Sequence, residues 1–130
     1  MTGSNPFSID KASDSFNRSF KKLYRATAEG LRSSFINEVD SIIGSLADVQ
    51  RPLSSSLESL PKKITLPPLC EFRKIRFTLS KGASGQIRLM YLVYFDARIV
   101  KPLLIYSHKQ FSKRPPDKDL ADVIKSVLEP

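Results

Sequence analysis

In the first half of the chain, apolar residues recur at the three- and four-residue spacing of amphipathic helices. Residues 6–10 are short and alternating, and they predict a first strand. Ser13 or Asp14 is a suitable N-cap for a helix whose apolar positions are Phe16, Phe20, Leu23 and Tyr24. After a break near Gly30, the same period continues over residues 31–47. We therefore expect a short strand followed by two adjacent, antiparallel helices.

From residue 72 onward, the period changes to the two-residue alternation of strands. Residues 72–79 and 87–95 predict two strands, and the second is apolar on nearly both sides, so it should lie centrally in a sheet. Residues 99–106 predict a third strand, in which Pro102 favours an edge or a bulge because it cannot donate to the ladder. Residues 115–117 begin a final helix with an apolar stripe formed by Leu120, Val123, Ile124, Val127 and Leu128.

Together these elements predict an α+β fold in a single domain. Residues 51–70 separate the helices from the strands, and their prolines and serines rule out regular structure over most of this connection. The expected architecture has two N-terminal helices packed on a twisted antiparallel sheet of three to four strands, plus a C-terminal helix. A chain of 130 residues with 41% apolar content can form one modest core.

The formal charge of +8 is concentrated in one segment of the chain. Residues 1–61 contain seven Lys/Arg and seven Asp/Glu, so they are neutral overall. Residues 62–114 contain twelve Lys/Arg against two acids, a net charge of +10, whereas residues 115–130 carry −2. A compact domain with such a basic segment is suited to a phosphate-rich partner. The alternative is a solvated basic face that only aids solubility.

The composition argues against several classes of protein and site. Cys70 is the one cysteine and cannot pair within the chain, which favours a reducing, cytoplasmic setting and a small apolar role for this side chain. One histidine and one cysteine cannot form the usual zinc site, and we expect neither a metal nor another cofactor. No apolar stretch approaches the roughly 20 residues of a membrane span, and no signal-peptide pattern is present. Neither paired catalytic carboxylates nor a Ser/His/Asp set is apparent.

Three cations are expected on one face of the sheet. Lys74 and Arg76 lie two residues apart on a strand, so they project from the same side, and a cross-strand neighbour can add Arg88. Like charges at this spacing repel, so cations kept without acids favour an anionic ligand. We expect Arg88 to be a surface residue whose truncation changes the free energy of unfolding by no more than about 0.5 kcal/mol. The turn at 80–85 adds Lys81 on a glycine-containing loop.

The segment after the third strand contains the residues best suited to acid/base chemistry. His108 is the only histidine, the residue type that exchanges protons most readily near neutral pH, although a lone histidine is also common at surfaces. Lys109 can act as a cation or as a base, and Lys113 and Arg114 add a basic pair. A site built from cations suits RNA, whose 2′-hydroxyl can attack the adjacent phosphate when a base accepts its proton and cations stabilise the added negative charge.

Tyrosines also occur near the basic segment. Bases could stack on Tyr91, Tyr94 or Tyr106, but Tyr91 is better explained as a core residue.

Three segments resemble the RelE/HigB superfamily of bacterial toxins: residues 72–77 (FRKIRF), 81–91 (KGASGQIRLMY) and 103–109 (LLIYSHK). Members of that family show an LRKIR strand, a GKSGGxRVIYY segment and a strand ending LLxY followed by lysine-rich residues. Residues 7–10 and 16–23 are similar to the family's first strand and first helix. The resemblance covers nearly the whole chain and is specific from residue 72 to residue 109.

This resemblance implies a cytoplasmic toxin of a type II toxin-antitoxin system, with helices packed against an antiparallel sheet. It implies a cognate antitoxin, encoded by an adjacent gene, that holds the toxin inactive. Many relatives cleave mRNA in the ribosomal A site. By position, Lys74, Arg76 and Arg88 match the family's basic residues on the sheet, and His108 or Lys109 matches the basic position after the last strand. The resemblance therefore implies that these five are the candidate catalytic residues.

The other candidate RNA-binding residues are Arg73, Lys81, Tyr106, Lys113 and Arg114. The chain departs from the family pattern at Gln86, which replaces the second glycine, and at Ala83, where a lysine is usual. The proline-rich connection before Glu71 is also longer than we expect from the family pattern.

Three functions remain open from the sequence. The first is a ribosome-dependent mRNA endonuclease that cleaves without a metal. The second is a non-catalytic toxin of the same fold that inhibits gyrase or another protein, since fold alone does not determine activity. The third is an RNA-binding module without cleavage. The convergent cations favour the first and third functions over the second.

Overall fold

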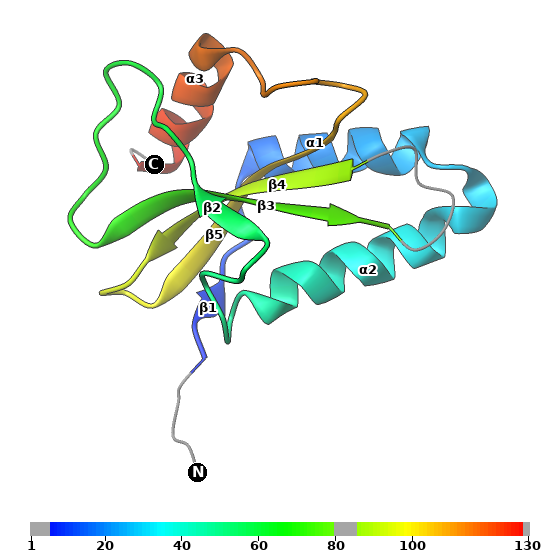
Figure 1. Cartoon of the computed structure of the whole chain (residues 1–130), viewed down its shortest axis with the longest axis horizontal. Coiled ribbons are helices and arrows are strands. Elements are labelled where there is room, and N and C mark those ends of the chain that lie inside the picture. Colours follow the sequence, from blue (N-terminus) through cyan, green and yellow to red (C-terminus); the bar gives the residue numbers. More distant parts are fainter. Residues whose placement is uncertain (1–5, 80–85, 129–130) are drawn as a thin grey trace.

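The computed structural model describes residues 6–79 and 86–128, which form a twisted sheet with helices on both faces (Figure 1). The helices are α1 (Asp14–Ala26), α2 (Arg32–Ser45) and α3 (Asp117–Leu128), with a short 3-10 turn, η1 (Glu29–Leu31), between the first two. The strands are β1 (Ser8–Ile9), β2 (Ser55–Leu57), β3 (Cys70–Thr78), β4 (Gln86–Tyr94) and β5 (Ile99–Ser107). The predicted α+β class, with two N-terminal helices and a C-terminal helix, is confirmed.

The N-terminal helices form where the apolar spacing predicts them. Ser13 is the N-cap of α1, and its side chain accepts a hydrogen bond from the Phe16 N–H at 3.3 Å. Helices α1 and α2 run in opposite directions (Figure 1), and the rings of Phe20 and Phe35 pack with their centroids 5.3 Å apart. The predicted helical hairpin is therefore present, and its apolar side covers one face of the sheet.

The strands follow the order β1-β5-β4-β3-β2 in a mixed sheet. Strands β2 to β5 pair antiparallel with their neighbours, but β1 is parallel to β5, with Ser8 opposite Ile99. The first strand expected within residues 6–10 is present, but the expected antiparallel sheet of three to four strands needs correction, because the described residues contribute five strands and β1 is parallel to β5. Strand β2 has only three residues and lies in the connection that the prolines predict to be irregular, so it is too short to show an alternating pattern.

Strand β4 lies at the centre of the sheet and is buried on both faces, as its apolar pattern predicts. One face packs under α1 and α2 through Ile87, Leu89, Tyr91 and Val93. The other face packs against α3 through Met90 and Leu92, which contact the cluster containing Leu120 and Ile124. Because side chains alternate along the strand, Arg88 belongs to the face that carries α3.

A bulge interrupts the pairing of β4 with β5. Met90 is opposite Leu104, whereas Tyr91 is opposite Pro102, so Leu103 is the additional residue. The predicted effect of Pro102 is confirmed, since the ladder is broken where a proline cannot donate a hydrogen bond. The side chain of Leu103 is 1% exposed and packs in the core beneath α3.

Candidate nucleic-acid interface

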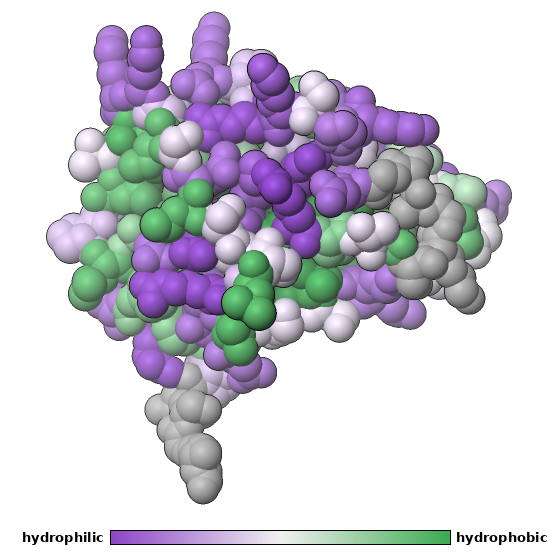
Figure 2. Space-filling view, in the orientation of Figure 1, coloured by the Kyte–Doolittle hydropathy of each residue, from purple (hydrophilic) through white to green (hydrophobic). Residues whose placement is uncertain are grey.

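A hollow of about 350 Å³ lies on the sheet face that carries α3, and we call it the basic hollow. Its lining consists of Lys74 and Arg76 from β3, Arg88 from β4, and Ser112, Lys113 and Arg114 from the segment before α3. Figure 2 shows hydrophilic side chains gathered over β3 and β4 on this side of the molecule. The strand alternation therefore brings the three strand cations together on one face, as expected.

Arg88 is the most deeply buried arginine of the basic hollow. It lies directly opposite Arg76 in the pairing of β3 with β4, but it is only 7% exposed, whereas Arg76 is exposed. The Nε atom of Arg88 is buried and has no hydrogen-bond partner. The expectation that Arg88 is a surface residue is wrong, because its strand is central and the chain after β5 covers the guanidinium. Burying this charge beside a second arginine costs free energy.

The guanidinium of Arg88 is hydrogen-bonded to His108. Its NH1 group lies 3.0 Å from Nδ1 of His108, and its NH2 group donates to Oε1 of Gln86 at 3.4 Å. Because a guanidinium only donates hydrogen bonds, Nδ1 must accept, and the neutral ring then carries its proton on Nε2. A lone pair of the imidazole is therefore directed at Arg88.

A compact turn after β5 holds His108 in place. Its backbone N–H donates to the Gln86 carbonyl at 2.9 Å and so extends the pairing with β4 by one residue. The side chain of Gln110 accepts from the Ser107 N–H at 2.9 Å, and the N–H groups of Gln110 and Phe111 donate back to the Ser107 carbonyl. His108 and Lys109 are both exposed in this turn, and neither is among the residues that line the basic hollow, but His108 contacts Arg88, which does line it.

Glu58 places a carboxylate among these cations. Its Oε1 lies 3.2 Å from Nζ of Lys74, and its Oε2 accepts from NH1 of Arg114 at 2.9 Å. Arg114 also forms an ion pair with Asp117 at 2.9 Å. The expectation that the cations stand without acids is therefore wrong. No local pattern predicts this contact, because Glu58 reaches the cations through the pairing of β2 with β3, which joins segments far apart in the sequence.

Tyr106 lies on β5 directly opposite Arg88 and is 2% exposed. Its ring packs edge-on against Phe111, with centroids 5.6 Å apart, so it presents no free face on which a base could stack. Its hydroxyl is buried without a hydrogen-bond partner, and burial, with a smaller effect of Glu58, raises the pKa of Tyr106 to about 12. Tyr91 is fully buried, which confirms it as a core residue. Tyr94 is half-buried and lies under Nζ of Lys101, which is 5.0 Å from its ring centroid.

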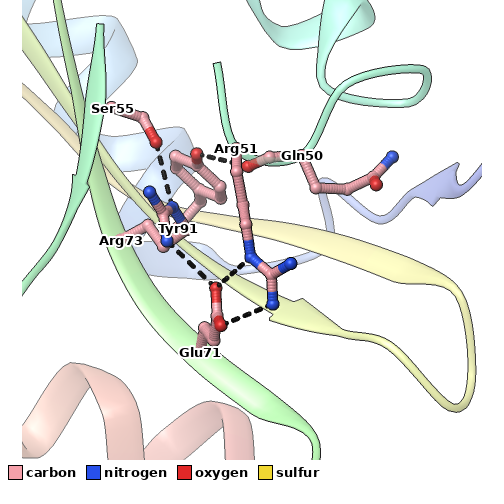
Figure 3. Close-up of polar contacts among 6 residues, drawn as sticks. All are labelled: Gln50, Arg51, Ser55, Glu71, Arg73 and Tyr91. Atoms are coloured by element: carbon pink, nitrogen blue, oxygen red, sulfur yellow. Dashed lines mark hydrogen bonds and ion pairs between the residues drawn. The ribbon is translucent and has the colours of Figure 1, made fainter. Parts of the chain in front are cut away.

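Arg73 lies on the face of the sheet opposite to Lys74, and Figure 3 shows it between Ser55 and Glu71. Its Nε donates to Oγ of Ser55 at 2.9 Å, and its NH1 forms an ion pair with Glu71 at 3.0 Å. Glu71 also accepts two hydrogen bonds from Arg51, and the pKa of this carboxyl is lowered, first by Arg51 and also by Arg73. These contacts, together with a hydrogen bond from Tyr91 to the Gln50 carbonyl, hold the start of the connection against the sheet. We therefore leave Arg73 out of the interface.

Two of the remaining candidates, Lys113 and Arg114, line the basic hollow. Lys113 is exposed, whereas Arg114 is held by Glu58. Lys81 lies outside the described residues. Within residues 6–79 and 86–128, no group of three or more His, Cys, Asp or Glu side chains could hold a metal ion. None of the helices in these same ranges has the length and apolar character needed to cross a membrane.

Comparison with solved structures identifies a protein of the same fold. E. coli toxin RelE, solved in the free state as a mutant in which two arginines are replaced by alanine, aligns over 94% of this chain and 98% of its own. The TM-score is 0.50 and the sequence identity is 15%.

The chain has a RelE-like fold. No protein-family model and no curated protein sequence matches it. At 15% identity the likeness to RelE concerns the fold, so any functional conclusion has to come from the side chains of the basic hollow.

Proposed function

We propose that this RelE-like protein is the toxin component of a type II toxin-antitoxin system and that it cleaves mRNA on the ribosome. The observation that carries the proposal is the hydrogen bond between Arg88 and Nδ1 of His108, at 3.0 Å, next to the exposed Arg76. Arg88 as a phosphate-binding cation and His108 as a proton acceptor are then neighbours. Cleavage of an RNA chain by its own 2′-hydroxyl requires both groups. The RelE-like fold supports the toxin assignment.

In the proposed complex, Arg76, Arg88 and Lys113 bind one phosphodiester of the RNA backbone. Arginine is suited to this role because its planar guanidinium can donate two parallel hydrogen bonds to phosphate oxygens. Lys113 is exposed and adds a further positive charge to the lining of the basic hollow. The like-charge contact between the two arginines would be relieved when the phosphate binds, which favours the bound state.

The proposed reaction is an attack of the 2′-oxygen on the adjacent phosphorus. As the phosphate binds, NH1 of Arg88 exchanges its hydrogen bond to His108 for one to a phosphate oxygen, which frees the lone pair of Nδ1. Nδ1 of His108 then accepts the proton from the 2′-hydroxyl, a bond forms between the 2′-oxygen and phosphorus, and the bond from phosphorus to the 5′-oxygen breaks. Arg88 and Arg76 stabilise the additional negative charge of the transition state. The leaving 5′-oxygen takes a proton from Lys109 or from water. The products are a 2′,3′-cyclic phosphate and a 5′-hydroxyl.

The proposed partner is a cognate antitoxin with acidic character, in a cytoplasmic setting. The segment 62–114 carries a net charge of +10, and opposite potentials accelerate association. Co-expression with the adjacent reading frame, followed by a pull-down at low and high salt, tests this point. Recovery of a complex supports the toxin assignment, whereas failure at both salt concentrations counts against it.

The cleavage reaction is tested by incubating purified protein with mRNA, with and without ribosomes and with and without a chelator. We expect cleavage on ribosomes that survives chelation and leaves 5′-hydroxyl ends. Cleavage lost on chelation, or 5′-phosphate ends, would refute this mechanism. RNA binding without cleavage would reduce the function to an RNA-binding module, and inhibited gyrase without either activity would move the assignment to a gyrase-type toxin.

A further inference from the structure

Glu58 is held among the cations of the basic hollow by its backbone as well as by its side chain. Its N–H donates to the Phe72 carbonyl at 2.8 Å, which continues the pairing of β2 with β3. The next carbonyl, that of Ser59, accepts from NH1 of Arg114 at 2.7 Å. The pairing of β2 with β3 therefore positions the carboxylate of Glu58 next to Lys74 and Arg114. The side chain of Glu58 is 11% exposed.

A carboxylate in this position competes directly with a phosphate. Both groups offer oxygen acceptors to lysine and arginine at similar distances, so the same donors cannot fully satisfy both. Glu58 is part of the chain, so its local concentration at these donors is far above that of any free ligand. Of the five cations that line the basic hollow, Lys74 and Arg114 are already paired with it, at 3.2 and 2.9 Å.

We propose that Glu58 withholds Lys74 and Arg114 from RNA, so that phosphates bind through Arg76, Arg88 and Lys113 alone. This inference rests on the proposed function, since it assumes that RNA enters the basic hollow. Under this proposal Glu58 limits the affinity for RNA. Arg76, Arg88 and Lys113 contact the phosphates, whereas Lys74 and Arg114 remain in ion pairs with Glu58.

The salt dependence of binding distinguishes the two groups of cations, because each cation that neutralises a phosphate releases counterions. For single strands, the slope of log K against log salt concentration is about −0.7 per phosphate contact. The probe is a single-stranded RNA with 2′-O-methyl groups, which binds but cannot undergo the proposed cleavage. Glu58→Gln should steepen the slope by about 0.7 to 1.4 and raise the affinity at low salt on the order of 10-fold.

Glu71→Gln is the matched control for this experiment. Glu71 also bridges two cations, Arg51 and Arg73, but on the opposite face of the sheet. Its replacement should leave the slope unchanged. Thermal unfolding of each variant shows whether the protein measured is folded.

A second pair of variants keeps the inference testable if Glu58→Gln does not fold. In the wild-type background, Arg76→Ala should reduce the magnitude of the slope by about 0.7, whereas Lys74→Ala should leave it unchanged. Equal reductions for both variants would overturn the role of Glu58, as would a Glu58→Gln slope identical to that of the wild type. In those cases the wild-type protein still binds RNA and the proposed function stands. Failure of the wild type to bind the probe at low salt would overturn both.

Discussion

Arg76 and Arg88 lie directly opposite each other in the antiparallel pairing of β3 with β4. Side chains at such positions are separated by about 5 Å at their Cβ atoms, so two positive charges here repel. Arg76 can extend into solvent, but Arg88 is 7% exposed and is held by His108 and Gln86. The repulsion between the two arginines lowers the stability of the free protein, whereas the same two charges favour the binding of an anion.

Arg76→Ala should stabilise the free protein while it weakens RNA binding. Removing one of two opposed like charges is expected to raise the free energy of unfolding by about 0.2–1 kcal/mol, measured by urea denaturation at low salt. The gain should shrink at high salt because ions screen the repulsion. Lys22→Ala, which removes an exposed cation from α1, is the control. A loss of stability in Arg76→Ala would mean that Arg76 makes a favourable contact that outweighs the repulsion.

Arg88→Met should retain the fold and lose cleavage. Replacing a buried cation with an apolar side chain of similar length is often neutral or stabilising, and Nε of Arg88 has no hydrogen-bond partner to lose. The hydrogen bonds to His108 and Gln86 are lost, but both of these residues are exposed, so water can replace the arginine. We expect an unfolding free energy within about 1 kcal/mol of the wild type or higher. Cleavage should fall at least about 100-fold, because a preorganised donor to the transition state is removed. Full activity in a folded Arg88→Met protein would exclude Arg88 from the reaction.

His108→Ala and Lys109→Ala should differ in their effect on cleavage. Loss of a general acid or base is expected to slow the reaction by about 10²- to 10⁴-fold. We expect the larger loss for His108→Ala, because His108 is hydrogen-bonded to Arg88, a residue that lines the basic hollow. Added imidazole should partly restore His108→Ala, as measured by initial cleavage rates. A larger loss for Lys109→Ala would transfer the proton-accepting role to the lysine.

Glu71→Gln should destabilise the fold in a pH-dependent manner. The pKa of Glu71 is lowered in the folded protein, first by its hydrogen bond to Arg51 and also by Arg73. The folded state therefore binds this proton less readily than the unfolded chain, so the stabilisation is present above the unfolded pKa and is lost as pH falls through the folded pKa. At pH 7 we expect a loss of about 1–2 kcal/mol by urea denaturation. The wild type and the variant should converge in acid, and a difference that is constant with pH would contradict this origin.

The sequence by itself determined which elements form and which way their side chains point. The apolar spacing predicts α1, α2, α3 and the three long strands, and the two-residue alternation places Lys74, Arg76 and Arg88 on one face. Pro102 likewise predicts the bulge in β5. These features follow from short-range geometry, because the period of a helix or strand is a property of neighbouring residues.

Only the tertiary structure decided how these side chains are paired and buried. Glu58 reaches Lys74 because β2 adds to the edge of β3, and a strand of three residues has no detectable period. Arg88 has the same alternation as Arg76, yet its neighbours β3 and β5 and the turn at His108 bury it. The alternation already places Arg73 on the face opposite Lys74, but only the fold brings Ser55 to its guanidinium there, beside the ion pair with Glu71. Burial and charge pairing depend on which distant segments meet, and local pattern does not carry that information.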